Sequence, residues 1–129
     1  MSGHLLDTSV LIAHQPAPTE QLPPSAAISV MTLGELHAGV LLARDASLRD
    51  GRRRRLDAVR AAFTALELDE SVAEHYGSVL ATARRQRRVA KASDLLIIAT
   101  AAAHERTLYT LDLAQARLAI AAGIDAVTG

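Results

Sequence analysis

The 129-residue sequence contains no cysteine and no tryptophan. Without cysteine, the chain cannot form a disulfide, a thiolate zinc site or a cysteine nucleophile. Aromatic residues make up only 2% of the chain, so the aromatic stacking surfaces on which RNA recognition motifs and OB-folds hold bases are not expected. The hydrophobic core must therefore be built from Ala, Val, Leu and Ile.

Long apolar runs and a leader segment are also missing from the sequence. The most apolar segment, Leu95 to Ala103, is too short to cross a bilayer. The N-terminus shows no basic stretch followed by an apolar run and a cleavage site. We therefore expect a soluble cytoplasmic protein without membrane association. All four prolines lie between Pro16 and Pro24, which predicts a surface loop there.

Short apolar segments alternate with amphipathic ones along the whole chain. Strands are expected at His4–Leu6, Ala27–Val30, Leu66–Leu68, Thr107–Thr110 and Asp125–Val127, with helices between them. This alternation predicts an α/β sandwich with a mainly parallel central sheet. The length and the absence of a linker predict one domain covering residues 1–129.

Several helix boundaries can be predicted from capping residues. Thr32 is expected to begin a helix, with Glu35 as the acidic partner of a capping box. The polar segment Asp45–Gly51 is expected to be a loop, and Ser71 to begin a later helix. Asp112 or Thr110 is expected to cap the last helix, roughly Leu113 to Ala121, which Gly123 ends. The run from Leu95 to Ala99 is apolar all round and predicts a helix buried on several sides.

Four acidic residues fall at predicted strand ends or helix starts. Asp7 and Asp112 follow strands at the end of the sheet where ligands bind in parallel α/β folds, and Glu35 and Asp94 lie near helix starts. If these carboxylates converge, their repulsion must be neutralised, and a hard divalent cation with oxygen ligands does so. Mg²⁺ or Mn²⁺ fits better than zinc, because no cysteine or paired histidine accompanies the acids.

Such a site suits hydrolysis of phosphodiester bonds, in which the metal activates a water and stabilises the developing charge. Asp7 and Asp94 are the expected direct ligands. Glu35 is expected to bind through water or to orient the nucleophile, and Asp112 to complete the site or hold a second metal. The hydroxyls of Thr8, Ser93 and Thr110 are expected to orient the ligands. Each acid taken alone is also explained as an ordinary helix cap or first-turn acid, so the residues alone leave both interpretations open.

Four segments resemble the motifs of PIN-domain ribonucleases, in the same order and at similar spacing over nearly the whole chain. The segments are Leu5–Ile12 with the first acid, Glu35–Gly39 with a Glu-x-x-x-Gly pattern, Ser93–Ala99 with the third acid, and Leu108–Asp112 with a Thr-x-Asp pattern. The length and single-domain plan look most like VapC-type toxins of bacterial toxin–antitoxin modules.

The resemblance implies a three-layer α/β/α sandwich and an endoribonuclease that depends on Mg²⁺ or Mn²⁺. It implies catalytic and metal-binding roles for Asp7, Glu35, Asp94 and Asp112. It also implies cleavage of tRNA, rRNA or mRNA that inhibits translation and growth, an antitoxin that blocks the site, and a homodimer, heterotetramer or larger assembly. The chain departs from the family pattern in two places. Ser93 stands where the family often has Asn, and Gln115-Ala116 stand where it often has Asp-Phe.

The net charge is zero, but thirteen of the fourteen basic residues are Arg, and eight of these arginines form two groups. Arg84, Arg85, Arg87 and Arg88 precede the third acid and are predicted either to contact RNA or to lie on the surface without a role. The run Arg52–Arg55 is either a solvated helix end or a contact with RNA or an acidic antitoxin segment.

The main alternative is a catalytically inactive PIN-fold interaction module. A phosphotransfer protein would need a second acid near Asp7 and a Lys after a late strand, and neither is present. A DNA nuclease of the same fold would be expected to carry more helices than 129 residues provide.

Overall fold

The sheet of this protein is wholly parallel. The computed structural model describes residues 3–13, 22–23 and 25–129. Its strands are β1 (His4–Leu6), β2 (Ala26–Ser29), β3 (Ala65–Leu66), β4 (Thr107–Thr110) and β5 (Ala126–Thr128), in the order β3-β2-β1-β4-β5. Each neighbouring pair is parallel, so the predicted parallel sheet is confirmed. The chain first moves outward from β1 to β3 and then returns to the other side of β1, which makes β1 and β4 the point where the strand order reverses.

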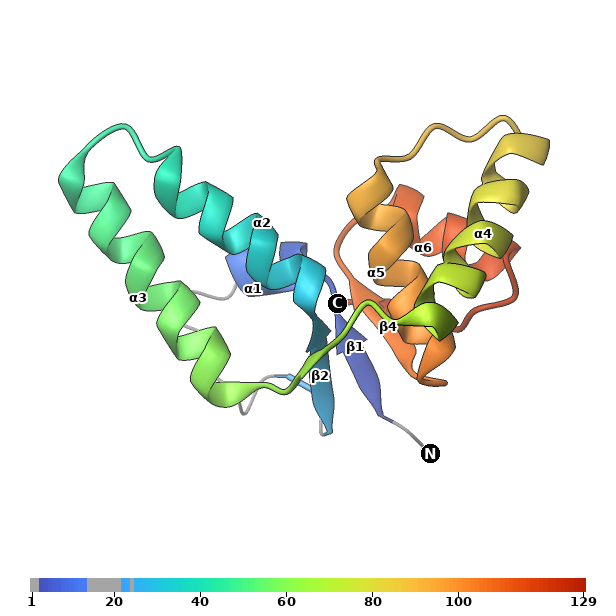
Figure 1. The fold of residues 1–129 in the computed structure, drawn as a ribbon, viewed down its shortest axis with the longest axis horizontal. Helices are drawn as coiled ribbons and strands as arrows, with labels where there is room; N and C mark the ends of the chain where they lie inside the picture. The colour runs from blue at the N-terminus through green and yellow to red at the C-terminus, as the bar shows by residue number, and fades with distance from the viewer. Residues whose placement is uncertain (1–2, 14–21, 24) are drawn as a thin grey trace.

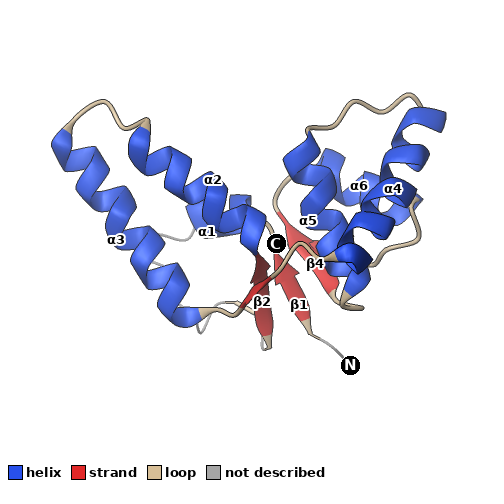
Figure 2. Ribbon diagram, in the orientation of Figure 1, coloured by secondary structure: helices blue, strands red, loops and turns tan. Residues whose placement is uncertain are grey.

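Helices cover both faces of the sheet (Figures 1 and 2). They are α1 (Thr8–Ala13), α2 (Val30–Leu41), α3 (Ala46–Ala62), α4 (Glu70–Arg85), α5 (Ala92–Ala103) and α6 (Leu113–Ala121). Successive strand residues point to opposite faces, so Leu5 packs with residues of α4, α5 and α6, whereas Leu6 packs with residues of α1, α2 and α3. The three-layer α/β/α sandwich is therefore confirmed.

The most apolar helix, α5, is buried on several sides, as its sequence predicts. Ile97, Ile98, Ala99, Thr100 and Ala101 are all 0% exposed. Because this helix is clamped between β1, β4, α4 and α6, its first turn is held in a fixed place at the end of the sheet. Over the described part of the chain, no helix has both the length and the apolar character that crossing a membrane requires.

The predicted start of α2 is wrong by three residues. Ser29 is the N-cap and its hydroxyl accepts the N–H of Met31 at 3.1 Å, so the helix begins at Val30 rather than after Thr32. Strand β2 thus runs directly into the helix, and the β-branched Val30 belongs to the helix although its type favours strand. Glu35 therefore lies in the second turn, and the capping box with Thr32 does not form.

Two further boundaries differ from the prediction because aspartates cap the helices. Asp45 accepts the N–H of Leu48 at 2.8 Å, so α3 already begins within the segment expected to be a loop. Asp69, not Ser71, caps α4 by accepting the N–H of Val72 at 3.0 Å. Packing of α3 against α2 outweighs the weak helix propensity of Gly51. The loop predicted around Pro16–Pro24 lies mostly outside the described residues.

Three helices end in a left-handed residue, and only one of these is glycine. Gly123, with φ +83°, ends α6, and the N–H of Ile124 bonds to the carbonyl of Ala119. Glu105, with φ +52°, occupies the equivalent place after α5, where the N–H of Arg106 bonds to the carbonyl of Ala101. Because a side chain at such a position meets its own backbone, Glu105 costs stability that a glycine does not.

Glu105→Gly is expected to stabilise the fold by about 1 kcal/mol, since it relieves the left-handed strain and Glu105 forms no ion pair within the described residues. Urea unfolding followed by circular dichroism measures the change. Glu105→Ala, which keeps a Cβ, should bring little of this gain. Gly123→Ala should cost a similar amount, because its added Cβ meets no atom within 4 Å and only the backbone angle matters. Equal stability of the Gly and Ala variants at position 105 would contradict this account.

Candidate active site

The four predicted acids come from four elements that meet at the carboxyl end of the sheet. Asp7 directly follows β1, and its N–H bonds to the carbonyl of Tyr109 in β4 at 2.8 Å. Asp112 lies two residues beyond β4, Asp94 is the third residue of α5, and Glu35 is the sixth residue of α2. This is the edge of a parallel sheet where ligands bind, at the reversal of the strand order.

Asp7 is the buried centre of this site. Its side chain is only 5% exposed. Oδ1 accepts the Nε2–H of Gln115 at 3.2 Å. Oδ2 accepts the N–H of Ser9 at 3.1 Å and lies 3.2 Å from the hydroxyl of Thr110. All these partners are neutral, so they fix the orientation of the carboxylate and leave its negative charge unpaired.

Gln115 belongs to the site, although the sequence marked it only as a departure from the family pattern. Its side chain is 3% exposed, and its Oε1 accepts the hydroxyl of Thr110 at 2.7 Å. Its Nε2 also lies 3.5 Å from the backbone carbonyl of Asp94. The amide therefore touches β4, Asp7 and α5 together. The signal in the sequence was its place three residues after the cap Asp112, on the first turn of α6.

Glu35 is held by a threonine of another helix. The hydroxyl of Thr8, in the first turn of α1, donates to Glu35 Oε1 at 2.6 Å. The same Oγ1 lies 3.0 Å from Oγ1 of the fully buried Thr32. Thr8 and Thr110 thus each contact an acid, and their role in orienting metal ligands stays a prediction. Ser93 is half-buried, and its side chain has no hydrogen-bond partner among the described residues.

The pKa of Asp94 is affected by the charges of the other three predicted acids. Its pKa is raised above the ordinary value by burial first and by Asp7 second, with smaller contributions from Asp112 and Glu35, while Lys91 opposes them. A raised pKa means that the folded state holds this proton more tightly than the unfolded chain. The stability linked to Asp94 is therefore present at low pH and is lost as pH rises through the range above its ordinary pKa.

Asp112 has a structural role besides its place near Asp94. It is the N-cap of α6, and its Oδ1 accepts the N–H groups of Ala114 at 3.0 Å and Gln115 at 3.2 Å. The cap expected from the sequence is therefore present. Its side chain is exposed, and its Oδ2 has no partner among the described residues. Asp112 is thus the least enclosed of the four acids.

The donor atoms suit a hard cation, but the acids do not form a closed cage. Over the described ranges, no group of three Asp, Glu or His side chains is close enough to bind one ion together. Mg²⁺ commonly uses only one or two carboxylates and keeps several waters. Asp7, held in place by neutral donors, and the partly exposed Asp94, which has no hydrogen-bond partner for its carboxylate in the described chain, fit this open type of site.

Comparison with known proteins decides the family. A model of the PIN domain matches residues 4–121. The chain belongs to the PIN-domain family. Ribonuclease VapC8 of Mycobacterium tuberculosis is 41% identical over 102 residues, which cover 75% of this chain and 88% of the relative.

Solved structures share the fold over almost their whole length. VapBC-5 of Mycobacterium tuberculosis, a member of the VapBC family of toxin–antitoxin systems, has a TM-score of 0.87 and 30% identity and covers 100% of both chains. FitAcB of Neisseria gonorrhoeae has a TM-score of 0.78 and 26% identity and covers 95% of both chains. The sequence-based assignment to PIN-domain ribonucleases is thus confirmed at the level of the family.

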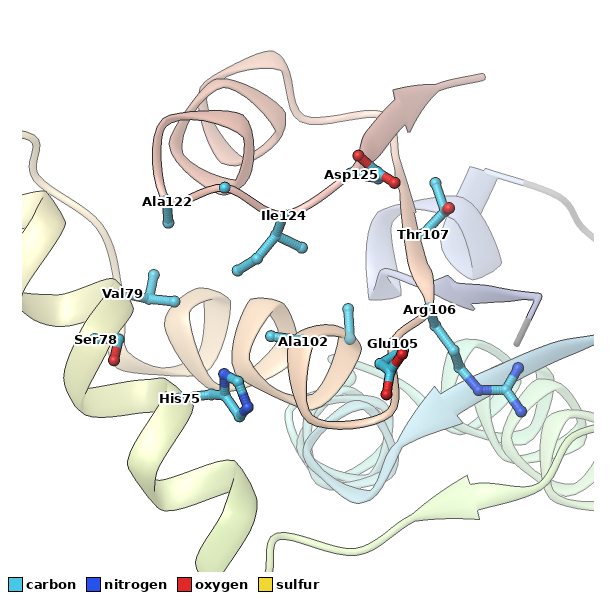
Figure 3. Close-up of a pocket in the computed structure, with 12 residues that line it drawn as sticks. His75, Ser78, Val79, Ala102, Glu105, Arg106, Thr107, Ala122, Ile124 and Asp125 are labelled. Atoms are coloured by element: carbon cyan, nitrogen blue, oxygen red, sulfur yellow. The ribbon is translucent and has the colours of Figure 1, made fainter. Parts of the chain in front are cut away.

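A hollow of about 450 Å³ lies at the opposite end of the PIN domain (Figure 3). Its lining includes His75, Glu105, Arg106 and Asp125, and none of the predicted acids. Arg106 points away from His75 and Ile124 and donates to the backbone carbonyls of His4 and Ser25. Because this hollow faces the amino ends of the strands, it lies away from the edge where parallel sheets bind ligands.

The two arginine groups lie apart from each other and form no ion pair with any described residue. Arg84 and Arg85 end α4, and Arg87 and Arg88 lie in the loop that leads to α5. Arg88 lines a second hollow together with Asp94 and Asp112, whereas the run Arg52–Arg55 lies on α3. RNA contact by the group near α5 stays a prediction.

Gln115→Leu is expected to destabilise the protein by about 1–3 kcal/mol, because the buried Asp7 and Thr110 each lose a hydrogen-bond partner. Urea unfolding measures the loss. Gln115→Glu provides the matched control. It can still reach Thr110 but places a second carboxylate beside Asp7, so its loss should be larger at pH 8 than at pH 5. Wild-type stability in Gln115→Leu would show that the amide does not hold the site together.

Proposed function

We propose that this protein is a metal-dependent endoribonuclease that acts as the toxin of a toxin–antitoxin pair. The supporting observation is the convergence of Asp7, Glu35, Asp94 and Asp112 at one end of the sheet, where the other three acids all raise the pKa of Asp94. The 41% identity to a ribonuclease covers most of both chains, so it favours RNA as the substrate.

In this proposal, Asp7 and Asp94 hold a divalent cation. Asp7 is suited to this role because Gln115, Ser9 and Thr110 fix the direction of its two oxygens without neutralising it. Asp94 is suited because its carboxylate is only partly buried and unbonded within the described chain. The all-oxygen donor set favours Mg²⁺ or Mn²⁺ as this ion.

A bound Mg²⁺ or Mn²⁺ would activate a water and stabilise negative charge on the phosphate. The protein's own groups orient the reactants. Glu35, held by Thr8 at 2.6 Å, keeps one carboxylate oxygen available to orient the attacking water and accept its proton. Asp112 Oδ2 has no hydrogen-bond partner within the described chain and would contribute a further negative charge at the site.

The proposed partner is an antitoxin that covers this site. The supporting observation is the likeness to VapBC-5, which belongs to a family of toxin–antitoxin systems and matches this chain over its full length. We extend the proposal to a toxin homodimer that assembles with antitoxin into a heterotetramer or larger complex. Its activity would be exerted in the cytoplasm, where cleavage of tRNA, rRNA or mRNA stops translation and growth.

The alternative is a PIN-fold interaction module without catalytic activity. The chain retains acids at all four positions, and neutral N–H donors from Ser9 and Gln115 orient the Asp7 carboxylate without pairing its charge. A module that only binds a partner has no need to keep unpaired charges close together. These features favour the enzyme.

Asp94→Asn is expected to lower the rate of RNA cleavage by at least about 100-fold, because it removes a charged metal ligand. The measurement is cleavage of total cellular RNA by purified protein in Mg²⁺ or Mn²⁺, with circular dichroism to show that the variant folds.

Asp57→Asn is the matched control, since Asp57 is exposed on α3 away from the acids. This variant should cleave at the wild-type rate, and EDTA should abolish cleavage by both it and the wild type. Cleavage that survives both Asp94→Asn and EDTA would refute the metal mechanism. An inert wild-type protein in either metal would favour the interaction module.

A further inference from the structure

A hollow beside the acids is not explained by metal binding. It has a volume of about 400 Å³ and is formed by the loop between α4 and α5 and by one face of α6. Asp94 and Asp112 lie on its wall, so it opens onto the proposed catalytic site. A volume of this size lies within the roughly 300–1,000 Å³ typical of pockets for small ligands.

The hollow combines apolar walls with basic groups. Val89, Ala90, Ala114 and Leu118 supply the apolar surface, and Arg88 and Lys91 supply positive charge. Neither basic residue forms an ion pair within the described chain. The acids on the same wall would bind a cation and the Arg88–Lys91 side would bind an anion. A nucleotide next to a scissile phosphate presents both a base, whose flat faces can pack on apolar side chains, and flanking phosphates.

Arg88 uses only one of its side-chain nitrogens, Nε, in a hydrogen bond within the described chain. Its Nε donates to Gln86 Oε1 at 2.7 Å, and the terminal nitrogens have no partner among the described residues. The loop is turned into place by Arg87, whose φ is +55°, and by the bond from the N–H of Arg88 to the carbonyl of Ala83 at 2.8 Å. The planar guanidinium can stack on a base or grip a phosphate.

Val89 is a large apolar side chain that is exposed to solvent. It is fully exposed, although burying such a side chain is favourable by about 1.5–3 kcal/mol. No aromatic residue lines the hollow, so a base held there would rest on aliphatic side chains and on the plane of Arg88. This arrangement is consistent with a chain that is poor in aromatics and rich in arginine.

We propose that this hollow binds the nucleotide adjacent to the phosphate that is cut, with the base against Val89, Ala114 and Leu118 and its phosphate near Arg88 and Lys91. The proposal rests on the ribonuclease function and adds the part of the site that reads the base at one position. Apolar contacts accept any base of the right size, so selection there depends on size and shape rather than on a pattern of hydrogen bonds.

Ala114→Leu tests the proposal because Ala114 is exposed on the first turn of α6 and a larger side chain fills the hollow without entering the core. The backbone bond from its N–H to Asp112 is unaffected by the change. Binding of a fluorescein-labelled short RNA pool, measured by anisotropy in EDTA, should weaken about fivefold or more. Sequencing of cleavage ends from a randomised RNA pool should show an altered base preference at one position beside the cut.

Ala121→Leu, at an exposed position of the same helix outside the hollow, is the matched control and should behave as wild type. Arg88→Gln and Lys91→Gln should weaken RNA binding for all sequences and lower its salt dependence by about one unit each. Arg60→Gln, on exposed α3 surface, should not.

An active wild-type enzyme, together with unchanged RNA affinity and unchanged cleavage sites in Ala114→Leu, would overturn the nucleotide site and leave the ribonuclease function standing. A wild-type protein that neither binds nor cuts RNA would overturn the function itself, and this inference with it. An Ala114→Leu protein that keeps its RNA affinity but no longer co-purifies with its antitoxin would assign the hollow to the protein partner and overturn the nucleotide site.

Discussion

The central constraint on this site is the unfavourable environment of the Asp94 carboxylate, whose pKa is raised by burial first and by the neighbouring Asp7 second. Burial and the neighbouring Asp7, Asp112 and Glu35 all make its charged form unfavourable, and they outweigh the preference of a helix N-terminus for negative charge. The fold imposes this arrangement because β1 and β4 are adjacent and parallel and α5 is buried against both. A sheet that brings together the carboxyl ends of its central strands also brings together the acids that follow them.

Neutral hydrogen-bond donors make this concentration of charge tolerable without removing it. Asp7 is held by the side-chain amide of Gln115 and the backbone N–H of Ser9, and Glu35 is held by the hydroxyl of Thr8. A lysine or arginine in these places would neutralise the acids and compete with a cation. Gln115 illustrates the principle, because it occupies a position where the family often carries another acid and instead supplies a donor to Asp7. The chain thus has fewer charges to neutralise and a more firmly oriented Asp7, the residue that we propose as a metal ligand.

The sequence predicted the parallel sheet and the positions of the acids because both follow from local patterns. Strand β4 and helix α6 were predicted with the bounds that the structure shows, since Asp112 and Gly123 mark the helix ends clearly. The starts of α2 and α3 were wrong because the cap Ser29 follows a strand without a break and because packing against α2 stabilises a polar first turn.

The contacts of Gln115 could not be predicted, because they join residues about a hundred positions apart. Sequence spacing indicates which side of α6 the amide occupies but not that Asp7 lies within its reach. The hollow beside Asp94 was missed for the same reason. Its two walls, the loop before α5 and the first turns of α6, meet only in the folded chain. The turn in that loop is made by Arg87 with a positive φ, and because this residue is not glycine, the sequence does not indicate a turn there.

The negative charges around Asp94 disfavour its charged form, and we propose that a divalent cation bound by Asp7 and Asp94 relieves this repulsion. Thermal unfolding of the wild type and of Asp94→Asn, each in EDTA and in excess Mn²⁺, tests it most directly. In EDTA at neutral pH, the variant should melt a few degrees above the wild type, because one repelling charge is gone. Mn²⁺ should raise the melting temperature of the wild type clearly and that of the variant much less, since a cation stabilises the fold only by binding to it. A wild type that is the more stable protein in EDTA and gains nothing from Mn²⁺ would contradict the account.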